Sequence, residues 1–390
     1  MTRPERTRSA DVSGGPRAAA LRQAARAAAL LDRLRRCEIW PFMLQSEVAD
    51  IAQGVVTQMS TDDLKNESGG VLVVTRGRIF SAAAKGATAI GGPAGNVSLR
   101  LLDNDGARPV MRQPVLLPTL FARDTNTWVL DRPHVLSVRG SFSAYLTEEG
   151  SGATTDVSLM LMGDAVLGDI TASEVDELVG MGLYPGVAGS GVAWAGPLLL
   201  SQDLPDGIPA GTELAILSLR GRVAELRTIL LRCRSRAVVL SSSVADVPAN
   251  GSADVPSDSL RNDTGWPLLV TAMMTSVVAG PSSTGVATPP YTILSADVSV
   301  LIGRTRRPLV WRPTVAALIG CADSGVWALD RPMVLDPGSS VEVKVQEEGG
   351  SSANDLYVSV HGQLVEGIGA AELRECVALG LLDGWRAQRD

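Results

Sequence analysis

The sequence repeats itself along most of its length. The segment WVLDRP at residues 128–133 returns as WALDRP at residues 327–332. Other identical residues keep the same spacing, among them the pairs Arg108 and Arg307, Pro114 and Pro313, Asp124 and Asp323, and Gly163 and Gly362. Cys37 and Cys233 match at a slightly shorter spacing. The matches keep their order along the chain, while the spacing between them changes a little. This pattern is typical of two domains that differ by loop insertions, so the sequence predicts two copies of one fold.

Each copy has the same order of expected elements. A helix with apolar residues three to four apart is expected over about 18–36 in the first copy and 213–234 in the second. Short segments in which apolar and polar residues alternate follow in both copies; they are 97–101, 142–146, 298–300 and 341–345. The segments 157–162 and 356–361 are the last expected strands of the two copies. A short helix with acidic residues then closes each copy, at 173–181 and 370–379.

The sequence therefore predicts an all-β protein with two tandem jelly-roll (antiparallel β-sandwich) domains, each with a preceding helix and a short trailing helix. About eight strands per copy is the number in a jelly roll, and the pattern alone leaves an immunoglobulin-like topology open. The expected order is a basic N-terminal arm and helix at 1–36, a first jelly roll with its trailing helix at 37–183, a Gly- and Pro-rich linker at 184–211, a connecting helix at 212–236, and a second jelly roll with a C-terminal helix at 237–390.

The composition offers little for catalysis or metal binding. The chain is 45% hydrophobic and 20% charged, as soluble globular proteins are, but it has only two histidines. His134 aligns with Met333 and His361 with Met162, so the repeat keeps neither histidine. No HxH, GxSxG or CxxC motif occurs, and the four cysteines lie far apart, as reduced thiols in a cytoplasm do. We expect no enzyme activity and no cofactor.

Three residue types recur at matching positions of the duplicated segment. Asp131-Arg132 and Asp330-Arg331 could form an acid–base pair, but an ion pair or a capping contact before a strand is the stronger interpretation. Trp128 and Trp327 could stack on a sugar, but tryptophans at matching positions of two copies more often anchor the cores. We expect these six residues to be structural.

The N-terminal helix is basic, whereas the rest of the chain is acidic. Residues 1–36 hold nine arginines and three acidic residues, although the net charge of the chain is -7. Arg22, Arg26, Arg33 and Arg36 gather on one face of the helix at a spacing of three to four residues. This face could lie on an anionic membrane, dock on the acidic surface of a neighbouring subunit, or pack under its own sandwich.

The second copy ends in a run that is similar to the last strands of phage structural jelly rolls. RPMVLDPGSS at residues 331–340 leads into the valine strand 341–345, and DLYVSVHG follows at 355–362. With the duplication and the basic helix, the chain resembles, over about 37–380, the double jelly-roll major capsid proteins of tailless icosahedral double-stranded DNA viruses, the lineage of tectiviruses and adenoviruses.

The resemblance implies a structural protein of the virion that forms a homotrimer, whose six jelly rolls make a pseudo-hexagonal capsomer of an icosahedral shell. The implied partners are the chain itself, neighbouring capsomers, and other virion proteins or an anionic internal membrane through the N-terminal helix, with no sequence-specific nucleic acid. The implied location is the virion, and the host cytoplasm during assembly. Two alternatives stay open: another bacteriophage virion component, such as a head decoration, connector or tail-associated jelly-roll protein, or a carbohydrate-binding module or cupin-like enzyme.

Overall fold

The computed structural model describes fourteen stretches of the chain. They are residues 16–48, 51–82, 97–104, 108–111, 113–121, 127–149, 156–184, 210–248, 251–279, 296–303, 307–309, 314–315, 326–347 and 354–382. Most of the expected linker 184–211 lies outside these residues, as do the arm before Pro16 and Cys321.

The first copy begins with a helix, continues through strands and ends with a short helix. Its elements are α1 (Pro16–Leu34), β1 (Glu38–Val48), β2 (Val56–Gln58), β3 (Val71–Ala82), β4 (Val97–Asp103), β5 (Arg108–Pro109), β6 (Val115–Leu116), α2 (Leu117–Leu120), β7 (Thr127–Leu136), β8 (Phe142–Glu148), β9 (Asp156–Leu167) and α3 (Ala172–Gly180).

The second copy repeats this order. Its elements are α5 (Ala210–Arg232), β10 (Arg234–Val247), β11 (Ser252–Val255), the 3-10 helix η1 (Ser257–Leu260), β12 (Leu268–Ala279), β13 (Ala296–Ile302), β14 (Arg307–Pro308), β15 (Thr314–Val315), β16 (Val326–Leu335), β17 (Val341–Glu347), β18 (Asn354–Glu366) and α7 (Ala370–Ala378). The preceding and trailing helices that the sequence predicts are therefore confirmed in both copies.

The strand order decides between the two sandwich topologies. In the first copy, one sheet has the order β1-β9-β3-β7 and the other β2-β8-β4-β5, with β6 beside β4. Successive strands alternate between the two sheets, except that β4, β5 and β6 lie in the same sheet, and the first strand pairs with the last, antiparallel. The second copy repeats this with β10-β18-β12-β16 and β11-β17-β13-β14, with β15 beside β13. This is the order of a jelly roll, so the two tandem jelly rolls are confirmed.

The repeated glycine has a clear physical reason. A Cβ atom at Gly163 in β9 would lie 1.9 Å from the Val73 carbonyl oxygen, and one at Gly362 in β18 would lie 2.4 Å from the Leu269 oxygen. In both copies a β-bulge interrupts the pairing of the neighbouring strand directly beside this glycine. A bulge bends a strand and brings its backbone close to its neighbour, so each copy needs a residue without a side chain there.

A buried asparagine closes the turn before the third strand of each copy. The Asn66 Nδ2 donates to the Gly70 oxygen at 2.9 Å, and the Asn262 Nδ2 donates to the Trp266 oxygen at 3.0 Å. In both turns the hydroxyl two residues later donates to the asparagine Oδ1 at 2.6 Å. These side chains supply partners for backbone groups that a sheet would leave unpaired, which explains why the repeat keeps them.

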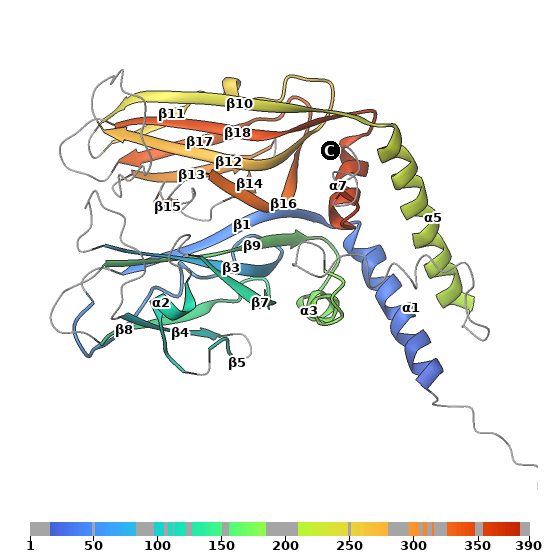
Figure 1. Cartoon of the computed structure of the whole chain (residues 1–390), viewed down its shortest axis with the longest axis horizontal. Coiled ribbons are helices and arrows are strands. Elements are labelled where there is room, and N and C mark those ends of the chain that lie inside the picture. The colour runs from blue at the N-terminus through green and yellow to red at the C-terminus, as the bar shows by residue number, and fades with distance from the viewer. Residues whose placement is uncertain are drawn as a thin grey trace, which may run out of the picture.

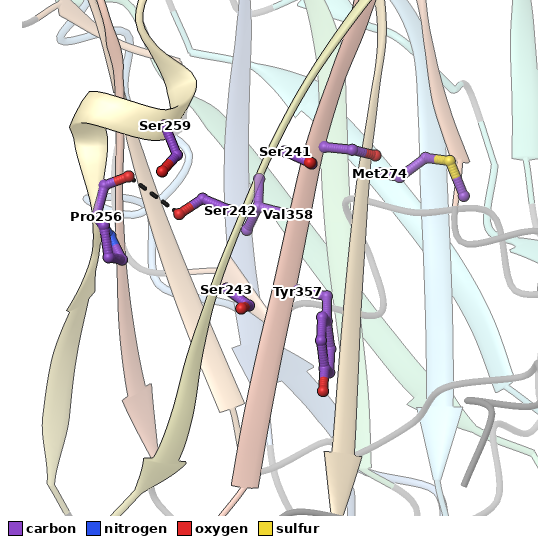
Figure 2. Close-up of a pocket in the computed structure, with 9 residues that line it drawn as sticks. Ser241, Ser242, Ser243, Pro256, Ser259, Met274, Tyr357 and Val358 are labelled. Atoms are coloured by element: carbon purple, nitrogen blue, oxygen red, sulfur yellow. Dashed lines mark hydrogen bonds between the residues drawn. The ribbon is translucent and has the colours of Figure 1, made fainter. Parts of the chain in front are cut away.

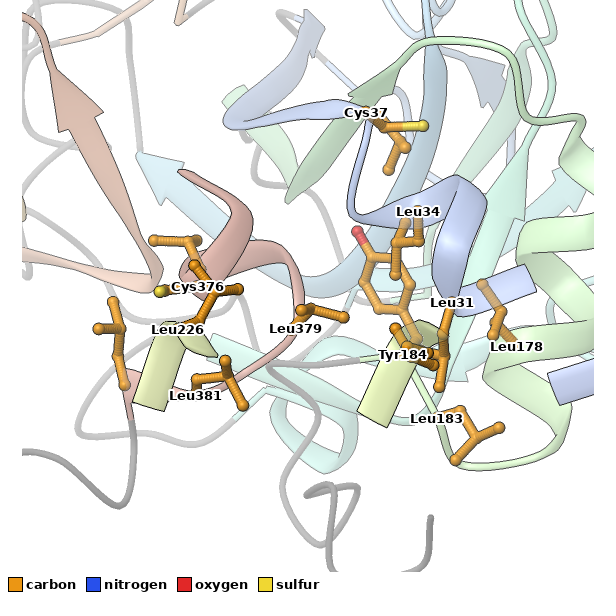
Figure 3. Packing of buried hydrophobic residues seen from close by; sticks show 14 of the residues in the cluster. Leu31, Leu34, Cys37, Leu178, Leu183, Tyr184, Leu226, Cys376, Leu379 and Leu381 are labelled. Carbon is orange, nitrogen blue, oxygen red and sulfur yellow. The ribbon is translucent and has the colours of Figure 1, made fainter. Parts of the chain in front are cut away.

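The two sandwiches lie beside each other, and α1, α3, α5 and α7 gather at one common end (Figure 1). Each sandwich has its own apolar core, and a third cluster joins the four helices. In that cluster Leu31 and Leu34 of α1 lie near Tyr184, and Leu226 of α5 lies near Cys376 (Figure 3). The helical end therefore ties the two copies into one body.

Candidate assembly surfaces

Among the described residues, no group of three or more His, Cys, Asp or Glu side chains could hold a metal ion. His134 lies 3.0 Å from an Asp103 oxygen in the first copy, and His361 lies 2.8 Å from the Ser359 hydroxyl in the second. None of the described helices has both the length and the apolar character that crossing a membrane requires.

The arginine face of α1 meets acidic groups of its own chain. Arg26 binds both carboxylate oxygens of Glu177 at 3.0 and 3.2 Å, and Arg33 binds Glu174 at 2.7 Å. Arg36 pairs with Asp32 one turn earlier in α1. Because both glutamates lie in α3, this face packs beside its own trailing helix. The Arg22 side chain lies outside the described residues.

The described arginines of the duplicated Asp-Arg pairs form ion pairs with acidic residues of other elements. Arg132 is exposed and binds Asp176 of α3 at 2.8 Å, and Asp131 is exposed. Arg331 is buried and meets Asp164 in β9 of the first copy at 3.4 Å. The partner of each described arginine thus comes from another element. The Asp330 side chain lies outside the described residues.

Trp128 is half-buried and packs edge-to-face on Phe121, with ring centroids 6.3 Å apart. Packing against a buried ring is what a core anchor would show. The Trp327 side chain lies outside the described residues.

The outer face of β1 and β9 is buried against the second sandwich. We call it the covered face; it consists of Met43, Ser158, Met160, Met162 and Asp164. Its three methionines belong to the apolar cluster of the second sandwich, whereas the alternate residues of both strands point into the first. The Met43 amide donates to the Leu309 oxygen at 3.1 Å, and β1 contacts β16. The second jelly roll therefore docks its β14–β16 edge on this face.

The same face of the second jelly roll is open. β10 and β18 pair Val239 with His361, just as β1 and β9 pair Met43 with Met162. The residues equivalent to the covered face, which we call the open face, are Val239, Tyr357, Ser359, His361 and Gln363. Val239 is 56% exposed and Tyr357 is 45% exposed, whereas Met43 has no exposed surface. The open face is also more polar, since serine, histidine and glutamine replace two methionines and an aspartate.

A hollow of about 510 Å³ lies on this open side. Ser241, Ser242 and Ser243 of β10 line it, together with Tyr357 of β18 (Figure 2). Ser359 of β18 lines it as well. The Ser242 hydroxyl donates to the Pro256 oxygen at 3.0 Å, whereas Ser241 and Ser243 lie on the other side of the strand and are exposed. Such a lining suits contact with a surface that carries both polar and apolar groups.

A buried polar group links the two copies at the covered face. The Arg331 guanidinium of β16 lies 3.4 Å from Asp164 and 4.7 Å from the centre of the Tyr184 ring. The Tyr184 hydroxyl donates to Asp164 at 3.3 Å. Burial raises the pKa of Asp164, and the Arg331 charge offsets part of that rise. Because each group would be costly to bury alone, the pair fixes the position of one jelly roll on the other.

No family model matches the chain, and no curated protein matches it. Among solved structures the chain is similar to the major capsid protein P2 from bacteriophage PM2, with 9% identity over 84% of this chain and 100% of that one and a TM-score of 0.22. It is also similar to the PBSX exported protein XepA, with 10% identity over 84% and 88% and a TM-score of 0.17. A third is VP2 in an infectious bursal disease virus subviral particle, with 9% identity over 86% and 74% and a TM-score of 0.19. Likenesses this distant carry no argument about function.

Sequence reasoning did not single out the covered and open faces. The signal was present in the aligned copies, because Met43, Met160 and Met162 align with Val239, Ser359 and His361. In the first copy, apolar residues lie on both sides of these strands, whereas in the second copy they lie mainly on one side. This difference indicates that both faces of the sheet are buried in the first copy only.

Proposed function

We propose that the chain is a structural protein of a virus shell, a major capsid protein that assembles as a homotrimer. The supporting observation is that Met43 is buried by the second jelly roll while its equivalent, Val239, is exposed. In this contact, the face of the first jelly roll binds the edge of the second, so two different surfaces are joined. Such a head-to-tail contact leaves the open face of the second jelly roll and the edge of the first jelly roll unused.

The second unused surface is the β5–β7 edge of the first jelly roll. Arg331 on the docked edge is 3% exposed, whereas the side chain of its equivalent, Arg132, is 60% exposed. Leu309 is buried, and its equivalent Val110 is partly exposed. Each chain thus offers an edge and a face that are equivalent to two surfaces already in contact within it.

Repetition of the same contact between chains produces a ring when the rotation closes, and a filament when it does not. We infer a ring of three chains, in which six jelly rolls form a pseudo-hexagonal capsomer. Such a unit can tile the facets of an icosahedral shell, and the duplication gives one chain two lateral surfaces that can vary independently. The protein would then reside in the virion, and in the host cytoplasm during assembly, without enzyme activity.

Light scattering combined with negative-stain microscopy of the purified protein tests this proposal. We expect particles of about 122 kDa, three times the 40.8 kDa of one chain, with a six-lobed outline. A protein that stays monomeric at every concentration reached would contradict the trimer. It would instead favour the alternative of an accessory virion component, because that role needs no ring.

A further inference from the structure

Two positions beside the contact between the jelly rolls change their charge from one copy to the other. Asp164 and Gln363 are equivalent, since each directly follows the repeated glycine of β9 or β18. Asp176 and Arg374 are equivalent, since each is the fifth residue of α3 or α7. Arg374 is itself balanced by an ion pair with Asp336. The second copy therefore lacks both acids that the first copy has at these positions.

These changes decide which acid the repeated arginine binds. In the first copy, Arg132 of β7 binds Asp176 of its own trailing helix at 2.8 Å. In the second copy the basic Arg374 occupies that position, and Arg331 of β16 meets Asp164 on the first jelly roll at 3.4 Å instead. The arginine of the first copy is thus neutralised within its copy, and the arginine of the second is neutralised across the contact.

The proposed contact between chains keeps the charges balanced. Within the chain, Arg331 on the docked edge lies against Asp164 on the covered face. The equivalent contact between chains would bring Arg132 of one chain against Gln363 on the open face of the next. Because Arg132 already binds Asp176 and Gln363 is neutral, this contact also encloses one cation and one anion.

The two mismatched contacts would lose that balance. If the edge of a first copy docked on the face of another first copy, Arg132 would be shared by two carboxylates, Asp176 and Asp164. If the edge of a second copy docked on the face of another second copy, Arg331 would meet the neutral Gln363 in place of Asp164. A charge that is buried without its counter-charge is strongly destabilising, so both mismatched contacts are disfavoured.

We propose that two pairs of equivalent residues determine which edge docks on which face: Asp164 with Gln363, and Asp176 with Arg374. Because these residues favour only contacts between unlike copies, first and second jelly rolls alternate around a ring built from further copies of this chain. This inference rests on the proposed trimer and names the residues that give its subunit contact its specificity.

The test is an exchange of charge at the contact between chains, followed by sedimentation equilibrium of the full chain. Gln363→Asp adds a carboxylate opposite the balanced Arg132–Asp176 pair, and Asp176→Asn removes the acid that Arg132 binds. We expect each single variant to raise the concentration at which half of the chains are monomeric at least about tenfold. The double variant should return to within about threefold of the wild type, because Arg132 regains one acid, now on the neighbouring chain.

The matched control is Gln58→Asp on β2. Gln58 and its equivalent Asp254 are both exposed, so this position lies outside the repeated contact and the added carboxylate should leave the trimer unchanged. Asp176 is exposed and Gln363 is half-buried, so we expect all variants to keep the circular dichroism spectrum of the wild type.

The outcomes separate this inference from the proposed function. A single variant that forms trimers as readily as the wild type would overturn the inference and leave the trimer intact. Losses that add up in the double variant would overturn it as well, because they would show that Arg132 does not pass from one acid to the other. A wild type that never forms trimers would overturn the proposed function together with the inference.

Discussion

Met43 and Val239 occupy the same position in the two jelly rolls, yet Met43 has no exposed surface and Val239 is 56% exposed. The Met43 amide donates to Leu309 of the second copy, so the difference arises because the second copy covers the first. In the proposed assembly, this contact inside the chain is the template for the contact between chains.

Replacing Val239 tests that template without disturbing a core. We expect Val239→Glu to weaken trimer formation about tenfold or more, because a carboxylate would be buried at the new contact. Size-exclusion chromatography with light scattering measures the shift towards monomer. The control is Val56→Glu on β2: Val56 and its equivalent Ser252 are both exposed, so this variant should assemble normally. Equal assembly of the two variants would argue against the template.

The repeated glycine makes a prediction about stability. Gly163→Ala should lower the free energy of unfolding by about 3 kcal/mol or prevent folding, because its methyl group would overlap the Val73 carbonyl. Gly265→Ala, where no atom lies within 4 Å of the new Cβ, should change stability by less than about 0.5 kcal/mol. Chemical denaturation of both variants gives the comparison, and similar midpoints would show that the close approach of β3 and β9 has been misjudged.

The buried Arg331–Asp164 pair predicts unequal effects of one substitution at two equivalent positions. Arg331→Met should cost about 3 kcal/mol, since Asp164 would stay buried without its cation. Arg132→Met, at an exposed ion pair with Asp176, should cost less than about 1 kcal/mol. Adding Asp164→Asn to Arg331→Met should recover part of the loss. Thermal unfolding monitored by circular dichroism measures all three, and a lack of recovery would mean that Arg331 acts through other contacts.

The lowered pKa of Glu375 predicts how the stability of the folded protein changes at acidic pH. Burial alone would raise the pKa of Glu375, but hydrogen bonds from Arg222 and Arg35 outweigh it and hold the pKa below its ordinary value of 4.5. A carboxyl whose pKa is lower in the folded state stabilises above the unfolded value and loses that stabilisation as the pH falls through the folded value. Glu375→Gln should therefore be less stable than the wild type at pH 7, and the difference should shrink below pH 4.5.

Urea unfolding across that pH range checks this prediction. Glu225→Gln is the control, because it removes an exposed partner of the same Arg222 and should change stability by less than about 0.5 kcal/mol. A difference between wild type and Glu375→Gln that stays constant from pH 7 to acid would contradict the assignment.

The sequence predicts the individual helices and strands better than it predicts which strands pair in the sheets. The alternation at 341–345 predicts a strand because every second side chain enters the core, and β17 confirms it. Jelly-roll topology could not be separated from the immunoglobulin type, because the pairing of β1 with β9 joins residues more than one hundred positions apart. No local pattern carries that information.

The contacts between the helices could be predicted from the sequence in part. The acidic residues of α3 and the arginines of α1 were both visible in the sequence, but which would meet depends on how the helices pack at the end of the sandwich. Arg26 with Glu177 and Arg222 with Glu375 are equivalent pairs in the two copies. Comparing the copies for charges retained in both would have predicted this contact.

The most direct test of the head-to-tail contact is a cross-link between chains. Val110 and Val239 are equivalent to Leu309 and Met43, which are joined by a backbone hydrogen bond of 3.1 Å. We would combine Val110→Cys and Val239→Cys with Cys321→Ser and treat the protein with a short bismaleimide. The native cysteines Cys37, Cys233 and Cys376 are buried.

A closed ring of three predicts covalent dimers and trimers for the double variant and no larger species on a denaturing gel, with each single variant staying monomeric. Absence of cross-linked chains in the folded double variant would contradict the account. So would dimers of the Val239→Cys variant alone, because they would show that the open face meets another open face.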